Sequence, residues 1–336
     1  MAMISAGTSH TCGVTPAGVV KCWGHYEQVD AGNRTSLVPV NVMGLSPGVL
    51  AVSCGGQACV ATSTGGAKCW GVESAVPHAV EGLSSGIVSV SVGRFAACAV
   101  RSTGTVRCWG TPGSSILGNG GSLVPRDVEG LSGVVSVSAG YLHVCAVTSA
   151  GAVKCWGHND AGQLGNGSRS GESSVPVAVA NLSSGVASVS AGFRRTCAVT
   201  SAGAVKCWGF NDLGQLGNGS TDDSPVPVAV EGLSSGVVSI SAGHSYTCAV
   251  ISTGAAKCWG SNMWGGFRVP STTYTSRVPV DVPGLASDVL SVSVGEFHAC
   301  AVTSTGAPKC WGRNDFGQLG NGSTIGSAVP VDVLGF

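Results

Sequence analysis

Charge is scarce in this chain. Only 10% of the 336 residues are charged, and 17 Lys and Arg residues balance 17 Asp and Glu residues. With neither a basic surface nor an acidic tail, the composition argues against a nucleic-acid-binding protein. Long hydrophobic runs are missing too, since no segment approaches the ~18 apolar residues of a membrane-spanning helix. Hydrophobic stretches with a helical period are almost absent, which favours a strand-rich fold.

Cysteine, in contrast, is abundant and regularly placed. A segment of the form Cys-Ala-Val-Thr-Ser-Ala-Gly-Ala-Val-Lys-Cys-Trp-Gly, as in residues 197–209, occurs seven times with small changes. Its alternating residues flank an apex that ends in Gly, which predicts a β-hairpin because the last residue of such a turn takes a positive φ. Centred on this apex, the hairpin places its two cysteines opposite each other, within reach of a disulfide.

We therefore predict one disulfide in each of the seven hairpins. Zinc binding is the alternative, but structural zinc sites need four clustered ligands, often from short Cys-x-x-Cys segments. The predicted pairs are Cys12 with Cys22, Cys59 with Cys69, Cys98 with Cys108, Cys145 with Cys155, Cys197 with Cys207, Cys248 with Cys258, and Cys300 with Cys310. The fifteenth cysteine, Cys54, either bridges outside its own repeat or stays a buried free thiol.

The repeat predicts the fold. Successive hairpins begin 39 to 52 residues apart, and each unit adds a strand before the hairpin and another after a turn-rich stretch. Four short antiparallel strands in each of seven units predict an all-β, seven-bladed propeller that spans residues 1–336 as a single domain. The chain begins with a first strand and ends with a last strand. We therefore expect the two ends to close the ring by meeting in one blade.

Longer motifs accompany the hairpin. They are Ser-Ala-Gly-x-x-His-x-Cys-Ala-Val, Trp-Gly-x-Asn-Asp-x-Gly-Gln-Leu-Gly-Asn-Gly and Val-Pro-Val, and they are most complete in residues 139–167, 191–219 and 294–322. These motifs closely resemble the regulator of chromosome condensation repeat along essentially the whole chain. The resemblance implies a seven-bladed propeller used as a binding platform.

The family also suggests possible activities. Its founding member is an exchange factor for the small GTPase Ran, and bacterial relatives include a secreted inhibitor of β-lactamase. Paired hairpin cysteines do not suit a nuclear protein, however, and no unit carries the inserted hairpin of the exchange factor. The resemblance therefore implies a scaffold without naming its partner.

The cysteine content also predicts the compartment. Fourteen cysteines in matched pairs indicate an oxidising environment, so we expect a secreted or cell-surface protein. The first residues lie inside a repeat and show no basic-then-apolar leader. We therefore expect the export signal to lie outside this sequence, as part of a longer secreted protein.

The repeats differ most in the short turn between the first strand and the hairpin. In a propeller these turns ring one end of the central channel, and aromatic and Arg side chains are frequent in interface hot spots. The predicted rim residues are His10, Gln57, Arg94, Phe95, Tyr141, His143, Phe193, Arg194, Arg195, His244, Tyr246, Glu296, Phe297 and His298. The alternative is that the second residue of each turn plugs the channel wall and that His10, His143 and His298 bond the neighbouring backbone.

A second irregularity lies in the loops that follow Trp-Gly in the first and sixth units. These loops contain Tyr26, Met263, Trp264, Phe267 and Arg268. An unrepeated Trp beside Phe and Arg indicates either a contact patch or the packing of an unusual loop.

No combination of residues points to catalysis. Gly-Leu-Ser-Ser-Gly at residues 82–86 and 232–236 matches a nucleophile-elbow pattern, but it lies between repeats without the required helix. We find no unique nucleophile, carboxylate pair or metal cluster beside the histidines, so we predict no enzyme, cofactor or metal site. We expect an extracellular binding protein that recognises a protein or a glycan through the rim. The alternatives are a GTPase exchange factor and, less favoured, a secreted enzyme inhibitor or hydrolase.

Overall fold

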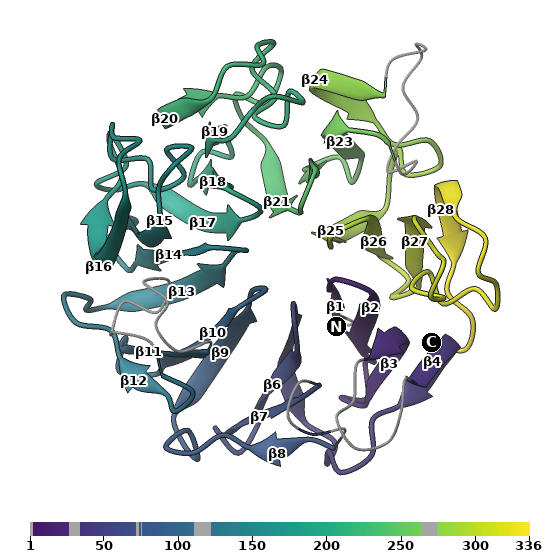
Figure 1. Cartoon of the computed structure of the whole chain (residues 1–336). Helices are drawn as coiled ribbons and strands as arrows, with labels where there is room; N and C mark the ends of the chain where they lie inside the picture. Colours follow the sequence, from purple (N-terminus) through teal and green to yellow (C-terminus); the bar gives the residue numbers. More distant parts are fainter. Residues whose placement is uncertain (1–2, 27–33, 72–73, 75, 111–121, 264–273) are drawn as a thin grey trace.

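The computed structural model describes residues 3–26, 34–71, 74, 76–110, 122–263 and 274–336. Seven four-stranded antiparallel sheets surround a central axis (Figure 1), and the strands of each sheet follow the order of the sequence. The predicted seven-bladed propeller is confirmed. Among the described residues, no helix has the length and apolar character to cross a membrane.

Each sheet forms one blade, numbered here from the N-terminus. Blade 1 contains β1 (Met3–Ala6), β2 (His10–Val14), β3 (Val20–Tyr26) and β4 (Arg34–Asn41). Blade 2 contains β5 (Val49–Cys54), β6 (Ala58–Thr62), β7 (Ala67–Trp70) and β8 (His78–Ala79). Blade 3 contains β9 (Ile87–Val92), β10 (Ala96–Arg101), β11 (Val106–Gly110) and β12 (Arg126–Asp127). Blade 4 contains β13 (Val134–Ala139), β14 (His143–Thr148), β15 (Val153–His158) and β16 (Glu172–Ala178).

The remaining blades repeat this plan. Blade 5 contains β17 (Val186–Ala191), β18 (Arg195–Thr200), β19 (Val205–Gly209) and β20 (Ser224–Ala229). Blade 6 contains β21 (Val237–Ala242), β22 (Tyr246–Ile251), β23 (Ala256–Ser261) and β24 (Thr275–Asp281). Blade 7 contains β25 (Val289–Val294), β26 (His298–Thr303), β27 (Pro308–Gly312) and β28 (Ser327–Asp332). The outer strands of blades 2 and 3 are the shortest in the described part of the ring.

The cysteine hairpins have the predicted register. In blade 5, Cys197 pairs with Cys207, and the apex glycine Gly203 has a φ of 79°. All seven predicted disulfides are present, with Cα–Cα distances between 4.0 and 4.1 Å. Each bridge is buried and fixes the middle two strands of a blade to each other.

A ring of serine hydroxyl groups joins the innermost strands. One serine of each inner strand accepts a hydrogen bond, 2.9 Å long, from a backbone N–H of the adjacent blade. The bonds run from Ala6 to Ser293, Cys54 to Ser5, Val92 to Ser53, Ala139 to Ser91, Ala191 to Ser138, Ala242 to Ser190 and Val294 to Ser241. These contacts explain the second serine of the Ser-x-Ser pattern in the first strands. They link inner strands of neighbouring blades that are not paired into one sheet.

The ring closes between two complete blades. β1 pairs within blade 1 and β28 pairs within blade 7, so no strand is shared. The expectation that both ends of the chain meet in one blade is wrong. Blades 1 and 7 instead lie side by side (Figure 1), and their contact includes a hydrogen bond of 2.9 Å from Trp23 Nε1 to the Gln318 carbonyl.

Candidate functional site

The first residues of the turns meet at one mouth of the central channel. Each follows a glycine that approaches the next blade so closely that a side chain would not fit. A Cβ on Gly192, for example, would lie 2.5 Å from the Gly243 carbonyl oxygen. The same carbonyl accepts a hydrogen bond of 3.1 Å from the Phe193 N–H. This backbone contact fixes the direction of the residue that follows the glycine.

The same contact recurs around the ring and builds the mouth. Its hollow, of about 90 Å³, is lined by the side chains that follow these glycines: Thr8, Arg94, Tyr141, Phe193, His244 and Glu296. Five of these six are predicted rim residues. The structure brings them together from blades 3 to 7.

Aromatic side chains form a continuous row at this mouth. The ring centroids of Phe95 and Tyr141 lie 5.3 Å apart, and those of Tyr141 and Phe193 lie 4.9 Å apart. Phe193 stacks on His244 at 4.2 Å, and His244 lies 5.7 Å from Phe297. We call these five side chains the aromatic arc. Edge and stacked contacts of this kind hold aromatic rings in defined positions.

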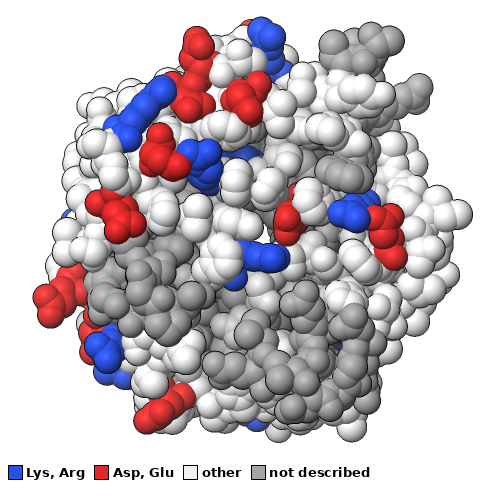
Figure 2. Space-filling view, in the orientation of Figure 1, with Lys and Arg blue, Asp and Glu red and all other residues white. Residues whose placement is uncertain are grey.

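An ion pair crosses the mouth. Arg94 of blade 3 lies 3.7 Å from the carboxylate of Glu296 in blade 7. Burial raises the pKa of Glu296, while the neighbouring Arg94 and Arg313 favour its charged form. Figure 2 shows basic and acidic atoms beside the central opening of the face in view. The mouth therefore combines apolar rings with one pair of opposite charges.

His244 is neutral at physiological pH. Burial and, to a smaller extent, the charges of Arg195 and Arg94 lower its pKa to about 4. Its imidazole can stack on Phe193 as an uncharged ring, which suits an aromatic surface better than an imidazolium.

Five predicted rim residues lie beneath the mouth instead of on it. They occupy the third position of the turns and are buried between blades: His10, His143, Arg195, Tyr246 and His298. Their placement on the rim was wrong, because the turn directs its first residue to the channel and its third residue to the adjacent blade.

The contacts of these buried residues are structural. His143 Nε2 lies 2.7 Å from Thr196 Oγ1, and His298 Nε2 lies 2.7 Å from Thr11 Oγ1. Burial lowers the pKa of His143 and of His298 to about 3. The alternative, in which the histidines bond the neighbouring backbone, does not describe these contacts either, since the partner of His143 and of His298 is a threonine hydroxyl of the next blade.

Arg195 is bound by the next blade in the same way. Its guanidinium donates hydrogen bonds to Thr247 Oγ1 at 3.1 Å and to the carbonyls of His244 at 2.8 Å and Tyr246 at 2.5 Å. Burial lowers the pKa of Arg195 to about 9. A buried guanidinium whose three nitrogens each donate a hydrogen bond to the next blade is an interface component and is not accessible to a ligand.

The other predicted residues lie near the mouth or outside it. Arg194 turns away from the channel, pairs with Asp160 and covers the Phe210 ring at 5.3 Å. Gln57 lines a separate hollow between blades 2 and 3, together with Arg94 and Phe95.

The second predicted patch is only partly described. Met263 is exposed. Tyr26 is the last residue of β3. Trp264, Phe267 and Arg268 lie outside the described residues.

Sequence reasoning missed a set of side chains that extends the arc. The Arg313 guanidinium lies 5.3 Å above the Phe297 ring and 5.9 Å from the Phe316 ring, and Phe316 lies 5.0 Å from His25. Arg313 and His25 occupy the position after Trp-Gly, which differs from repeat to repeat. That variation was the available signal, but it was used only for the loops of the first and sixth units and was not connected to the rim.

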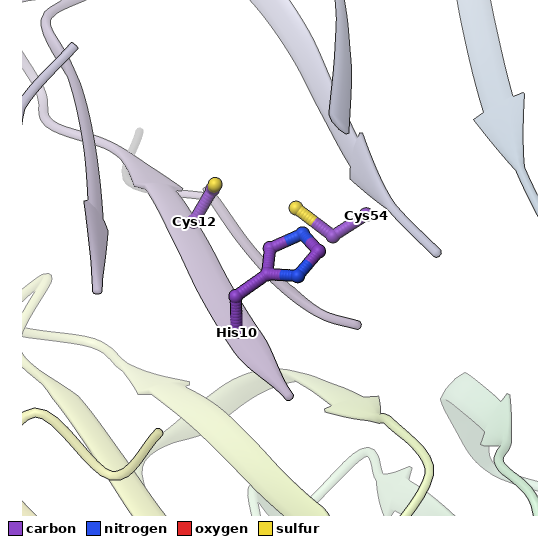
Figure 3. A group of neighbouring side chains, drawn as sticks. All are labelled: His10, Cys12 and Cys54. Atoms are coloured by element: carbon purple, nitrogen blue, oxygen red, sulfur yellow. The ribbon is translucent and has the colours of Figure 1, made fainter. Parts of the chain in front are cut away.

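Cys54 is a buried free thiol in the described part of the chain, as one of the two interpretations predicted. Figure 3 shows it beside His10 and Cys12, whose ligand atoms all lie within 4.8 Å of one another. Cys12 is bonded to Cys22, so its sulfur is not a free ligand. Burial raises the pKa of Cys54 to about 12. A neutral, buried thiol of this kind is neither a good nucleophile nor a good metal ligand.

Comparison with known proteins identifies the family. The family model of the RCC1-like domain matches residues 65–334. The chain belongs to the RCC1-like domain family.

Individual relatives match smaller parts of this RCC1-like chain. The human E3 ubiquitin-protein ligase HERC2 is 35% identical over 143 residues, which are 42% of the chain and 3% of HERC2. The ultraviolet-B receptor UVR8 of Arabidopsis thaliana is 36% identical over 144 residues, which are 42% of the chain and 32% of UVR8. The matched region is thus a small part of each relative.

Solved structures share the fold over most of the propeller. Prp20p of Saccharomyces cerevisiae superposes with a TM-score of 0.77 at 20% identity, covering 87% of this chain and 80% of Prp20p. Human WBSCR16 superposes with a TM-score of 0.78 at 22% identity, covering 91% of this chain and 88% of WBSCR16. The ectodomain of the Arabidopsis receptor kinase ACR4 gives a TM-score of 0.57 at 18% identity and covers 99% of each chain.

Proposed function

We propose that this RCC1-like propeller is a non-enzymatic binding protein of an oxidising, extracellular environment, in which residues 1–336 act as one domain. Its partner is a protein that docks on the aromatic arc. The observation that carries this proposal is the continuous row of five ring side chains, each from a different blade, at the channel mouth.

The arc has the properties of an interaction surface. Phe95 is exposed and the four other rings are half-buried, so each remains partly accessible to a partner. Rigid aromatic side chains bury a large area at low entropic cost, which makes them frequent anchors of protein interfaces. The rings already hold one another in place, so their side chains lose little conformational entropy when a partner binds.

The disulfides support the extracellular part of the proposal. Seven bridges, one in each blade, form and persist readily outside the reducing cytosol. The similarity to the ACR4 ectodomain agrees with this environment, although at 18% identity it concerns the fold alone.

Exchange-factor activity is the second candidate. It is favoured by the fold shared with Prp20p, a protein with binding properties to Gsp1p and histones. Measuring nucleotide release from Gsp1p in the presence of the oxidised protein tests it directly. Accelerated release would replace the first proposal.

A matched pair of variants tests the arc. The arc variant carries Tyr141→Ala, Phe193→Ala and Phe297→Ala. The control carries Val135→Ala, Val238→Ala and Leu290→Ala, which remove exposed apolar side chains from the inner strands of three blades. Captures from a surface extract of the source organism are then compared by quantitative mass spectrometry after cross-linking.

We expect one protein to be retained by the wild type and the control and lost by the arc variant. Equal retention by all three would refute the arc. If periodate treatment of the extract abolishes retention by the wild type and proteolysis of the extract does not, the partner is a glycan.

A further inference from the structure

Three blade interfaces are filled by the same loop. In blades 4, 5 and 7 the sequence Gly-Gln-Leu-Gly, at residues 162–165, 214–217 and 317–320, reaches the following blade. Its leucine is fully buried in each case: Leu164, Leu216 and Leu319. Leu216, for instance, packs in one cluster with Val230 of its own blade and Trp259 of the next.

Three of the four hydrogen bonds that hold each copy of this loop use an indole or backbone groups, and the fourth is donated by a threonine hydroxyl, as from Thr247 to the Gln215 carbonyl at 3.2 Å. In the blade 5 copy, Trp259 Nε1 donates to the Gln215 carbonyl at 3.0 Å. The Glu231 N–H donates to the Gly217 carbonyl at 2.9 Å, and the Gly219 N–H donates to the Arg277 carbonyl at 3.0 Å. The other copies form the same bonds, between Trp208 and Gln163, Ala180 and Gly165, Gly167 and Pro225, Trp23 and Gln318, Leu334 and Gly320, and Gly322 and Leu37.

Blade 2 has no such loop. Only six residues separate Trp70 from Pro77, whereas 18 residues separate Trp208 from Pro227 in blade 5. The three groups that would hold the loop are nevertheless present at the interface with blade 3: Trp109 Nε1, the Glu81 N–H and the Leu123 carbonyl. None of them forms a hydrogen bond with the described residues.

A hollow takes the place of the missing loop. It measures about 350 Å³ and is lined by Val80, Glu81, Trp109 and Leu123, together with Arg94 and Phe95 at its inner end. Val80 and Trp109 correspond to Val230 and Trp259, between which Leu216 packs. The Leu123 side chain is 58% exposed, whereas Leu37, at the same position in blade 1, is half-buried beside the Gly317 loop.

We propose that the hollow between blades 2 and 3 binds a turn of a partner protein that presents a leucine side chain between two backbone carbonyls, as Gln-Leu-Gly does. Three copies within this chain bind such a turn through the indole N–H, the backbone N–H, the carbonyl and the apolar contacts that this hollow also presents. The threonine donor of those copies is replaced here by Ala97. The Gln-Leu-Gly turns of a second copy cannot supply it, because they are buried in their own interfaces. The proposed occupant is a segment of another protein.

The site is distinct from the mouth of the channel but adjoins it. Arg94 lines both hollows, and Phe95 belongs to the arc and to the wall of the blade 2–3 site. A partner on the arc would thus lie next to this hollow. The two sites are tested with different variants, so either can fail alone.

The probe is a synthetic peptide of residues 211–219, Asn-Asp-Leu-Gly-Gln-Leu-Gly-Asn-Gly. It is titrated to millimolar concentration into the oxidised full chain labelled with ¹⁵N-tryptophan, and the indole N–H signals are followed by NMR. Trp109→Phe assigns the Trp109 signal. We expect this signal to shift downfield in a saturable way while the other indole signals stay in place.

A control peptide with Leu216→Ala should bind at least about tenfold more weakly, because it loses the buried side chain. The arc variant should bind the peptide like the wild type. An unmoved Trp109 signal, or equal binding of the two peptides, would overturn the proposal.

A grafted loop gives a second test that does not depend on peptide affinity. Residues 210–223 are inserted in place of residues 72–73, which gives blade 2 the loop of blade 5. The graft should raise the midpoint of thermal unfolding and abolish the peptide-induced shift of Trp109. A graft with the Leu216→Ala change should raise this midpoint by a smaller amount. No gain from either graft would show that the hollow does not accept the turn.

Discussion

The interface between blades 5 and 6 and the interface between blades 2 and 3 join copies of one repeat, yet they are built differently. At the first, the Gln215 carbonyl accepts hydrogen bonds from Trp259 at 3.0 Å and from Thr247 at 3.2 Å, and Arg195 binds the same threonine. At the second, Ala97 stands at the position of Thr247 and a hollow stands at the position of the loop.

This comparison indicates that the loop supplements a contact between blades that forms without it. The serine bond between inner strands is present at both interfaces, from Ala242 to Ser190 and from Val92 to Ser53. Neighbouring blades are therefore joined through their inner strands near the channel, and the loop adds a second contact farther from the channel. Where the loop is missing, the indole N–H, the backbone N–H and the carbonyl that would hold it are available to another molecule, although the threonine hydroxyl is not present.

The largest contrast should come from deleting the buried leucine. Leu216→Ala removes a side chain from a closed cluster, so we expect a loss of about 2–5 kcal/mol in the free energy of unfolding. Val124→Ala, at the edge of the blade 2–3 hollow, removes a side chain that is 47% exposed and should change stability by less than about 0.5 kcal/mol. Urea denaturation of both oxidised variants measures this, and equal losses would break the contrast.

Acid should weaken the interface between blades 4 and 5, which is one of the loop-filled interfaces. The pKa of His143 falls from 6.5 to about 3 on burial between blades 4 and 5. Below pH 6.5 the unfolded chain binds a proton that the folded chain does not, so stability decreases as the pH falls towards 3. This histidine should lower the folding equilibrium constant by about 16-fold between pH 6.5 and 5.

The variant His143→Gln isolates this effect, since Arg195 and His158, the other charges that act on His143, remain. Its urea midpoint should depend less steeply on pH than that of the wild type. Parallel curves for the two proteins between pH 7 and 5 would mean that His143 titrates normally in the folded state.

The smallest contrast lies in two equivalent indoles. Trp259→Phe removes a hydrogen bond to the Gln215 carbonyl, whereas Trp109 Nε1 has no partner among the described residues. Trp259→Phe should therefore cost about 1 kcal/mol more than Trp109→Phe. Thermal unfolding of the pair resolves the difference, and an equal cost would mean that the indole bond contributes nothing.

The fold was predictable because the sequence of a single repeat determines the strands of a blade. The spacing of Cys197 and Cys207 around a Gly apex sets the hairpin register, and seven copies leave few ways to pack. Ring closure was not predictable in the same way. Whether the last strand pairs with the first blade depends on contacts such as that between Phe336 and Trp23, whose rings lie 6.0 Å apart, and these do not appear in the repeat pattern.

The site was predictable in location but not in detail. Variation among the turns identified the mouth, where Arg94, Phe193 and Glu296 meet. The variation did not distinguish the first residue of a turn from the third, because both differ between repeats. Only the geometry of the blade interface shows that His143 is buried while Tyr141 lines the channel.

A threonine could have revealed the interfaces in advance. Thr11, Thr196 and Thr247 precede the hairpin cysteine only in the blades that follow a Gly-Gln-Leu-Gly sequence, and Ala or Val stands there in the other four blades. The hydroxyl is needed where a glutamine carbonyl accepts its hydrogen bond, at 2.9 Å from Thr11 to Gln318. This coupling is visible when each repeat is compared with the repeat that precedes it, and it is missed when the repeats are considered separately.

The serine ring has a consequence for the history of the molecule. The bond between blades 7 and 1 has the same length and the same chemical groups as the six bonds between blades linked by peptide. No junction is privileged, so moving the chain ends to another junction by circular permutation should preserve the ring. A gene encoding such a protein can grow by duplicating whole blades, because each added blade carries both the serine hydroxyl and the backbone N–H that bond its two neighbours.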